Sequence, residues 1–199
     1  WENLCALENF NSDKVVILIG DDSTGVAPIY LYIGEKDAAP ASLYSPPAFL
    51  KRNGLGLGNL FVWVSDTGDD DASAFKGTGS SRKGKFKKIT HWDATKAGTA
   101  GWDSLGFALQ ATQYAAANAL DSFTVARPED CSANPKDGTQ AVLVSTGSSG
   151  FAGGADSWGD TYIIDIDDKD LDTKLDQDLP DINDIVATIT IAYDGDDAG

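Results

Sequence analysis

The sequence has no methionine, one histidine and two cysteines, and its 15 basic residues are outnumbered by 31 acidic ones. The net charge of −16 excludes nucleic acid and an anionic membrane surface as partners, because both need clustered Lys and Arg to neutralise phosphates. His91, the single histidine, excludes a histidine-rich zinc site within this chain and is expected to be an ordinary polar residue beside Trp92. Cys5 and Cys131 are so far apart in the sequence that their spacing does not decide between a disulfide and two free thiols.

Long apolar runs are also lacking, and none reaches the roughly 18 residues of a membrane span, so we expect no span. The chain starts at Trp1, which predicts a processed product or an internal piece from which any export signal has been removed. Its apolar content of 42% excludes a disordered acidic tail. High acidity, 21 glycines and many aspartates are typical of extracellular calcium-dependent proteins, so we expect a secreted, extracellular or periplasmic location.

Short runs of β-branched and aromatic residues, each ending in small or acidic residues, indicate an all-β protein. Four such runs start at residues 15, 60, 142 and 187, at spacings of 45, 82 and 45, and 82 is close to two further units. Second strands are expected at residues 29–33 and 161–166. A period of about 40–50 residues is typical of β-propeller blades and predicts about four to five of them. The alternative is an unrelated sandwich with evenly spaced strands.

We therefore expect one incomplete propeller-like domain over residues 1–199, with one minor helical segment at 102–120. An exposed charged insertion is expected at about 66–88, where an acidic cluster precedes five basic residues in seven and the two blocks attract each other across a turn. The alternative for the basic block is phosphate binding. Residues 165–184 contain nine aspartates. Their spacing fails the EF-hand calcium pattern, because Lys169 is at the fifth position of that pattern. We therefore expect a solvated loop.

The segment with the most chemistry covers residues 122–147, SFTVARPEDCSANPKDGTQAVLVSTG. Pro128 is expected to hold Arg127 in an extended conformation. Residues two apart in an extended segment project to the same side, so Arg127 and Glu129 should point together. Such a pair is either a structural ion pair or an anion-binding arginine beside a metal-binding glutamate.

This segment resembles the PhoX-type alkaline phosphatase family of secreted calcium-dependent phosphatases, in which an Arg-Pro-Glu entering a strand is a hallmark. Residues 7–37, LENFNSDKVVILIGDDSTGVAPIYLYIGEKD, and residues 145–167, STGSSGFAGGADSWGDTYIIDID, are similar to further pieces of that family. Together the similar segments cover roughly half of the chain. The family is usually much longer than 199 residues, so we expect other chains or segments to complete the propeller.

The resemblance implies a β-propeller whose central mouth holds calcium ions, with iron in some members, and a small phosphomonoester as the substrate. It implies that Arg127 binds the phosphate as the catalytic residue and that Glu129 is a metal ligand. Asp21 or Asp22, together with Glu8, would be further ligands. The predicted function is a metal-dependent alkaline phosphatase. The alternatives are a non-catalytic, calcium-stabilised propeller acting as an extracellular structural or interaction module, and a carbohydrate-binding or adhesive module.

Overall fold

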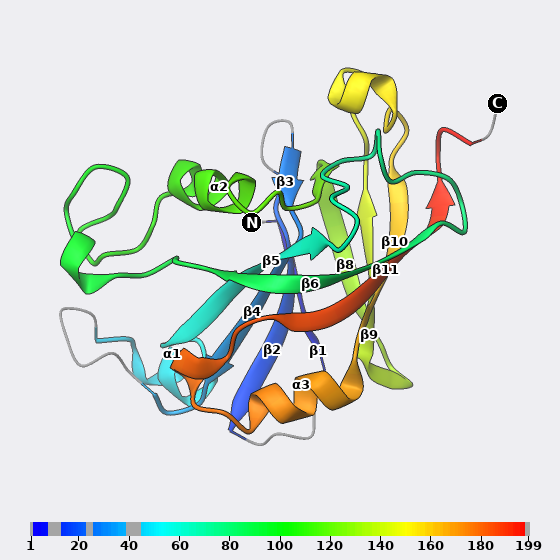
Figure 1. The fold of residues 1–199 in the computed structure, drawn as a ribbon. Helices are drawn as coiled ribbons and strands as arrows, with labels where there is room; N and C mark the ends of the chain where they lie inside the picture. The colour runs from blue at the N-terminus through cyan, green and yellow to red at the C-terminus, as the bar shows by residue number, and fades with distance from the viewer. Residues whose placement is uncertain (1, 8–12, 23–25, 39–44, 198–199) are drawn as a thin grey trace.

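The computed structural model describes residues 2–7, 13–22, 26–38 and 45–197 (Figure 1). The strands are β1 (Asn3–Leu7), β2 (Lys14–Gly20), β3 (Val26–Pro28), β4 (Tyr30–Glu35), β5 (Gly58–Ser65), β6 (Ser81–Ile89), β7 (Thr124–Ala126), β8 (Pro128–Asn134), β9 (Asp137–Ser145), β10 (Asp160–Ile166) and β11 (Ile185–Asp194). The helices are α1 (Ala48–Arg52), α2 (Gln110–Asn118) and α3 (Asp168–Leu175), with 3-10 turns at Ala94–Lys96, Phe151–Gly154 and Leu179–Asp181. None of the helices in these ranges is long and apolar enough to cross a membrane.

Nine of the strands form one antiparallel sheet in the order β1-β2-β4-β5-β6-β11-β10-β9-β8. The sheet curls strongly, so that its two edge strands, β1 and β8, lie against each other (Figure 1). β11 is last in the sequence but lies between β6 and β10, where it joins five strands from the first half of the chain to three from the second. β3 and β7 pair separately as a two-stranded ribbon.

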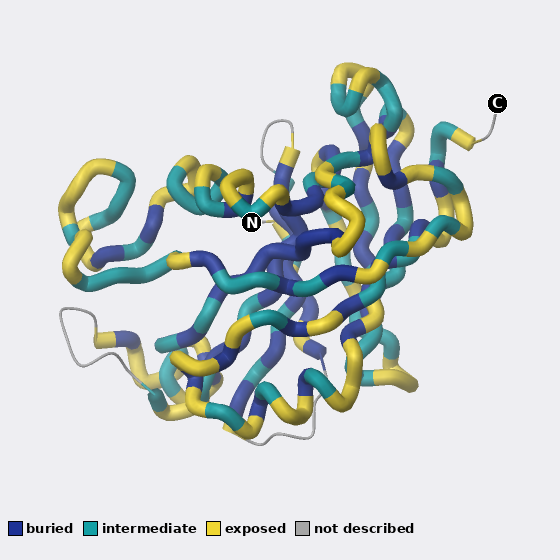
Figure 2. The backbone as a smooth tube through the Cα atoms, in the orientation of Figure 1, coloured by how far each residue is buried: buried dark blue, intermediate teal, exposed yellow. Residues whose placement is uncertain are grey.

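The interior of the curled sheet is an apolar core, which forms because alternate side chains of the strands point inward (Figure 2). In β5, Phe61 and Trp63 face this core, while Leu60 and Val62 face a second apolar cluster on the other side of the sheet. Ala117 of α2 belongs to that second cluster, so the helix covers this side of the sheet. Strands buried on both faces read as continuous apolar runs, which explains why the sequence of this region has such runs.

The all-β class predicted from the sequence is confirmed, and the fold is propeller-like. Each of the six predicted strand runs lies within or overlaps a strand of the main sheet, namely β2, β4, β5, β9, β10 and β11. The expected division into four to five blades is corrected by the strand pairing, because in the described residues these strands are hydrogen-bonded neighbours in one continuous sheet. Evenly spaced strand runs in the sequence reflect regular strand and turn lengths, but they do not determine which strands pair.

At residues 66–88 the sequence predicted an exposed charged insertion. The two charge blocks do attract, since Arg82 Nε lies 2.6 Å from Asp69 Oδ2. However, the basic block is β6, a central strand between β5 and β11, rather than an exposed loop. Gly84 and Phe86 are buried on one face of this strand and alternate with half-buried or exposed lysines, whose long stems can lie along the sheet with their charges in water.

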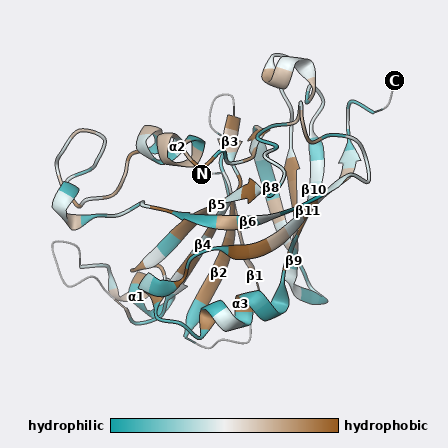
Figure 3. Cartoon of the chain, viewed as in Figure 1, coloured by the Kyte–Doolittle hydropathy of each residue, from teal (hydrophilic) through white to brown (hydrophobic). Residues whose placement is uncertain are grey.

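The aspartate-rich stretch at 165–184, expected to be a solvated loop, contains α3 (Figure 3). Leu171 and Leu175 are four residues apart on one face of the helix and both are buried, which is enough to dock a short helix against the sheet. The expected helical segment at 102–120 is confirmed for its second half by α2, and α1 and α3 are additional to the one minor helix predicted.

Asp167 caps α3, because its Oδ1 accepts a 2.8 Å hydrogen bond from the backbone N–H of Asp170. We expect Asp167→Ala to lower the free energy of unfolding by about 1 kcal/mol, the usual cost of losing an N-cap. Urea unfolding followed by circular dichroism measures this. Asp172→Ala, which removes an exposed carboxylate from the same helix, is the control and should change stability by less than about 0.5 kcal/mol. Equal effects of the two variants would show that the cap does not stabilise the fold.

Candidate functional site

Arg127, Asp22 and Glu129 form a cluster where β2 ends and β8 begins, which we call the arginine–carboxylate cluster. Arg127 Nε donates to Asp22 Oδ1 at 3.2 Å, and its Nη2 donates to Glu129 Oε1 at 3.1 Å. Thr146, which follows β9, donates to the same Glu129 oxygen at 3.2 Å. The cluster is accessible, since 46% of the Arg127 side chain is exposed. The hydrogen bond and charge of Asp22 raise the pKa of Arg127, which remains a cation.

The backbone at Arg127 differs from the extended conformation expected from Pro128. Its φ is 53°, in the left-handed region that L side chains other than Asn and Asp seldom adopt. The chain turns sharply here between β7 and β8, and the carbonyls of Ala126 and Arg127 accept hydrogen bonds from Gly147 and Thr146. The prediction that Arg127 and Glu129 point together is nevertheless met, through this turn rather than through strand alternation. Strained residues cost about 1–3 kcal/mol and occur most often at functional sites.

Asp21, another predicted site residue, does not join the cluster. Asp21 is almost fully buried, and its Oδ2 accepts hydrogen bonds from Tyr114 at 2.8 Å and from Gln110 at 3.3 Å, both in α2. Of the two aspartates offered by the sequence, Asp22 is therefore the one beside Arg127 and Glu129. Glu8 lies outside the described residues.

The predicted metal ligands can be tested against this geometry. Asp22 and Glu129 have the hard oxygen donors that calcium prefers, but calcium takes six to eight such ligands. In this structure, Arg127 supplies the positive charge between the two carboxylates. Across the described ranges, no three His, Cys, Asp or Glu side chains are grouped closely enough to hold a metal. These residues therefore do not make a calcium or iron site by themselves.

A second acidic group lies between β9 and β10, in a place that sequence reasoning missed. Asp156 is fully buried, and neither of its side-chain oxygens has a hydrogen-bond partner at normal distance within the described part of the chain. Burial raises its pKa to about 6. Burial also raises the pKa of the neighbouring Asp160 to about 7, although Tyr162 donates a 2.7 Å hydrogen bond to that carboxyl. Both groups can exchange protons near neutral pH.

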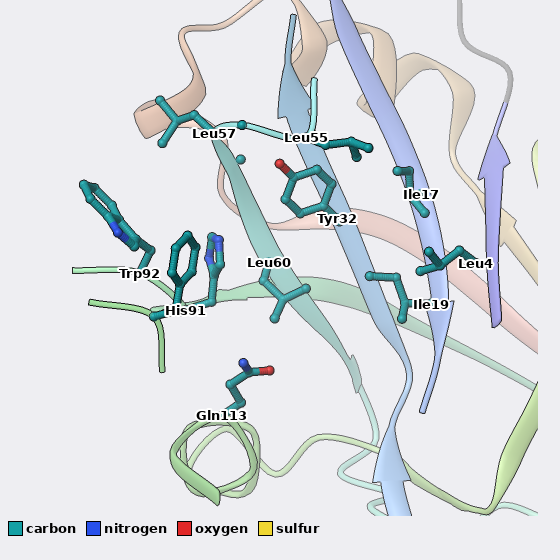
Figure 4. A pocket seen from close by; sticks show the side chains of 13 residues that line it. Leu4, Ile17, Ile19, Tyr32, Leu55, Leu57, Leu60, His91, Trp92 and Gln113 are labelled. Atoms are coloured by element: carbon teal, nitrogen blue, oxygen red, sulfur yellow. The ribbon is translucent and has the colours of Figure 1, made fainter. Parts of the chain in front are cut away.

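An apolar pocket of about 400 Å³ lies on the side of the sheet that α2 covers (Figure 4). Its floor is formed by apolar side chains of β1, β2, β4 and β5, and its walls include Trp92, Gln113 and His91. Burial lowers the pKa of His91 to about 4, so the imidazole is neutral at physiological pH. This pocket offers no cation to a phosphate and is chemically distinct from the arginine–carboxylate cluster.

These features define an all-β, propeller-like protein with an accessible arginine held by two carboxylates at one end of its sheet. No protein-family model matches the sequence, and no curated protein matches it. A solved structure of Pseudomonas fluorescens PhoX in complex with vanadate, a transition state analogue, is similar in fold, with a TM-score of 0.52 and 20% sequence identity. The similarity covers 94% of this chain but only 30% of that PhoX chain. The chain thus has a PhoX-like fold and spans about a third of the neighbour's length.

Proposed function

We propose that this chain is part of a phosphatase that hydrolyses small phosphomonoesters, with Arg127 binding the phosphoryl group. The observation that carries the proposal is the arginine–carboxylate cluster, in which a strained, accessible arginine lies beside Glu129 on a PhoX-like fold. The binding of the PhoX neighbour to vanadate supports a phosphoryl-type ligand for this fold.

The side chains of the cluster have separable roles in this proposal. The guanidinium of Arg127 has two N–H donors on Nη1 that can face phosphoryl oxygens, because its Nε and Nη2 donate to the carboxylates. Asp22 and Glu129 each accept a hydrogen bond from it, which fixes its orientation before the ligand arrives. Thr146 in turn orients Glu129. An oriented arginine costs less side-chain entropy on binding than a freely rotating one, so the cluster is suited to anion recognition.

The calcium requirement implied by the family resemblance needs more ligands than the cluster offers. We infer that a complete metal site would use residues outside the described part, Glu8 among them, and segments supplied by the rest of a longer protein. Secretion is part of the same proposal, since it rests on the resemblance and on the acidic composition. A non-catalytic propeller module is the competing function, and the limited set of metal ligands favours it.

The test measures vanadate binding by isothermal titration calorimetry and hydrolysis of p-nitrophenyl phosphate with calcium and after chelation. We expect vanadate binding by the chain, and turnover by the full-length protein that is lost on chelation. Binding without turnover under any metal would support the non-catalytic module. Absence of both would refute the proposed function.

A further inference from the structure

Cys5 and Cys131 meet at the seam where the curled sheet almost closes. Cys5 lies in β1 and Cys131 in β8, the two edge strands, which lie against each other. Cys131 Sγ is 3.3 Å from Asn3 Oδ1 and 3.7 Å from the carbonyl oxygen of Leu18. Leu18 is the cross-strand partner of Cys5 in the β1–β2 pairing. Since Asn3 and Cys5 are two residues apart on a strand, they share a face, and Cys131 is beside both.

The two thiols differ in environment, although both are free in this structure. Cys5 is buried in the apolar core, whereas Cys131 is half-buried at its edge. Cys131 is therefore the thiol that a small molecule can reach, and Cys5 lies behind it in the core. An accessible thiol beside a buried second thiol is the arrangement of an attacking and a resolving cysteine.

We propose that Cys5 and Cys131 form a redox-active site that a small-molecule disulfide, such as oxidised glutathione, converts to an intramolecular disulfide. The Cys131 thiolate attacks one sulfur of the small disulfide, and one small thiolate leaves. Cys5 then loses its proton and attacks Cys131 Sγ, and the second small thiolate leaves. The two protein thiols are oxidised by two electrons while one small disulfide is reduced to two thiols.

The disulfide would link β1 to β8, the two edge strands of the sheet, and close the seam covalently. It would close a loop of about 126 residues, and long loops are those for which a disulfide most restricts the unfolded chain. The inference is independent of the proposed phosphatase function, because it uses neither Arg127 nor the carboxylates beside it.

The experiment incubates the chain with excess oxidised glutathione, alkylates the remaining thiols and measures the intact mass. We expect the wild type to lose both reactive thiols without retaining glutathione, and to remain monomeric. Cys5→Ser should accumulate one glutathione adduct at Cys131, because no resolving thiol remains. Cys131→Ser should stay unmodified, because Cys5 is buried. The oxidised wild type should melt about 10 °C above the reduced form.

Two results would overturn the inference. If both wild-type thiols are still alkylated after the incubation, they do not react with the small disulfide. If the wild type retains a stable glutathione adduct, Cys5 does not reach Cys131. Because the wild type alone gives the decisive mass, a failure of either serine variant to fold does not affect the outcome.

Discussion

Replacing Arg127 with alanine is expected to weaken vanadate or phosphate binding by about 10- to 100-fold, while the fold stays intact. Charge-assisted hydrogen bonds contribute about 1.5–3 kcal/mol, and Nη1 of Arg127 can supply them to an anion while Nε and Nη2 hold the two carboxylates. The loss also leaves Asp22 and Glu129 without their shared cation, so two negative charges would face the incoming anion. Titration calorimetry of both proteins at the same ionic strength measures the effect.

Two further variants show whether this loss is specific to geometry. Arg127→Lys keeps the charge but not the planar fork, so we expect intermediate affinity. Arg52→Ala removes an exposed arginine of α1 and changes the net charge equally, so affinity should not change. If Arg127→Ala binds as tightly as the wild type, the Arg127–Glu129 pair is merely a structural ion pair.

Stability is expected to fall as the pH rises from about 4 to about 7, because two buried carboxyls must ionise. The pKa of Asp156 rises from 3.8 to about 6 in the folded protein. A carboxyl whose folded pKa is raised retains its proton in the folded state after the unfolded chain has lost it. Its stabilising contribution is therefore complete below the pKa of the unfolded chain, and it is lost as the pH rises through the pKa of the folded protein. For Asp156 the loss amounts to about 3 kcal/mol.

The measurement compares urea unfolding at pH 5 and pH 8 in buffer containing a chelator. Asp156→Asn cannot ionise, so its stability should fall by about 1 kcal/mol less over this range than that of the wild type, because more than half of the total loss has already occurred below pH 5. Asp172→Asn, at an exposed position, controls for the change in net charge and should follow the wild type. The same pH dependence in Asp156→Asn and the wild type would show that this carboxyl is not the group that titrates.

The strands were the most predictable part of the fold. Runs such as VVILI in β2 and TYIIDI in β10 combine β-branched residues with abrupt acidic or glycine ends. β6 was missed as a strand because its lysines outnumber its apolar residues, although the alternation of Gly84 and Phe86 with lysines was a usable signal. α3 was missed because the three aspartates within it and the one at each cap suggested only repulsion, while two leucines four residues apart were sufficient to fix the helix.

The arginine–carboxylate cluster was predictable as a pairing but not as a geometry. Arg127 and Glu129 are two residues apart, so their proximity is a local property. The choice between Asp21 and Asp22 depends on how β2 ends against β8 and α2, which the sequence of neither segment contains. Asp156 gave no signal in the sequence, because an aspartate in a Gly/Ser-rich loop is usually exposed. Its burial follows from packing against strands distant in the sequence.

The position of β11 has a consequence for how the molecule is made. Five strands of the sheet are encoded before residue 90, and three are encoded between residues 128 and 166. The sheet joins these two groups only once β11, which pairs with both, has been synthesised. Until then, β6 and β10 would present unpaired edges with exposed N–H and C=O groups, which favour aggregation. Folding of this sheet should therefore be completed only after β11 has been made, and it should be slow, as expected where the decisive contacts join distant parts of the chain.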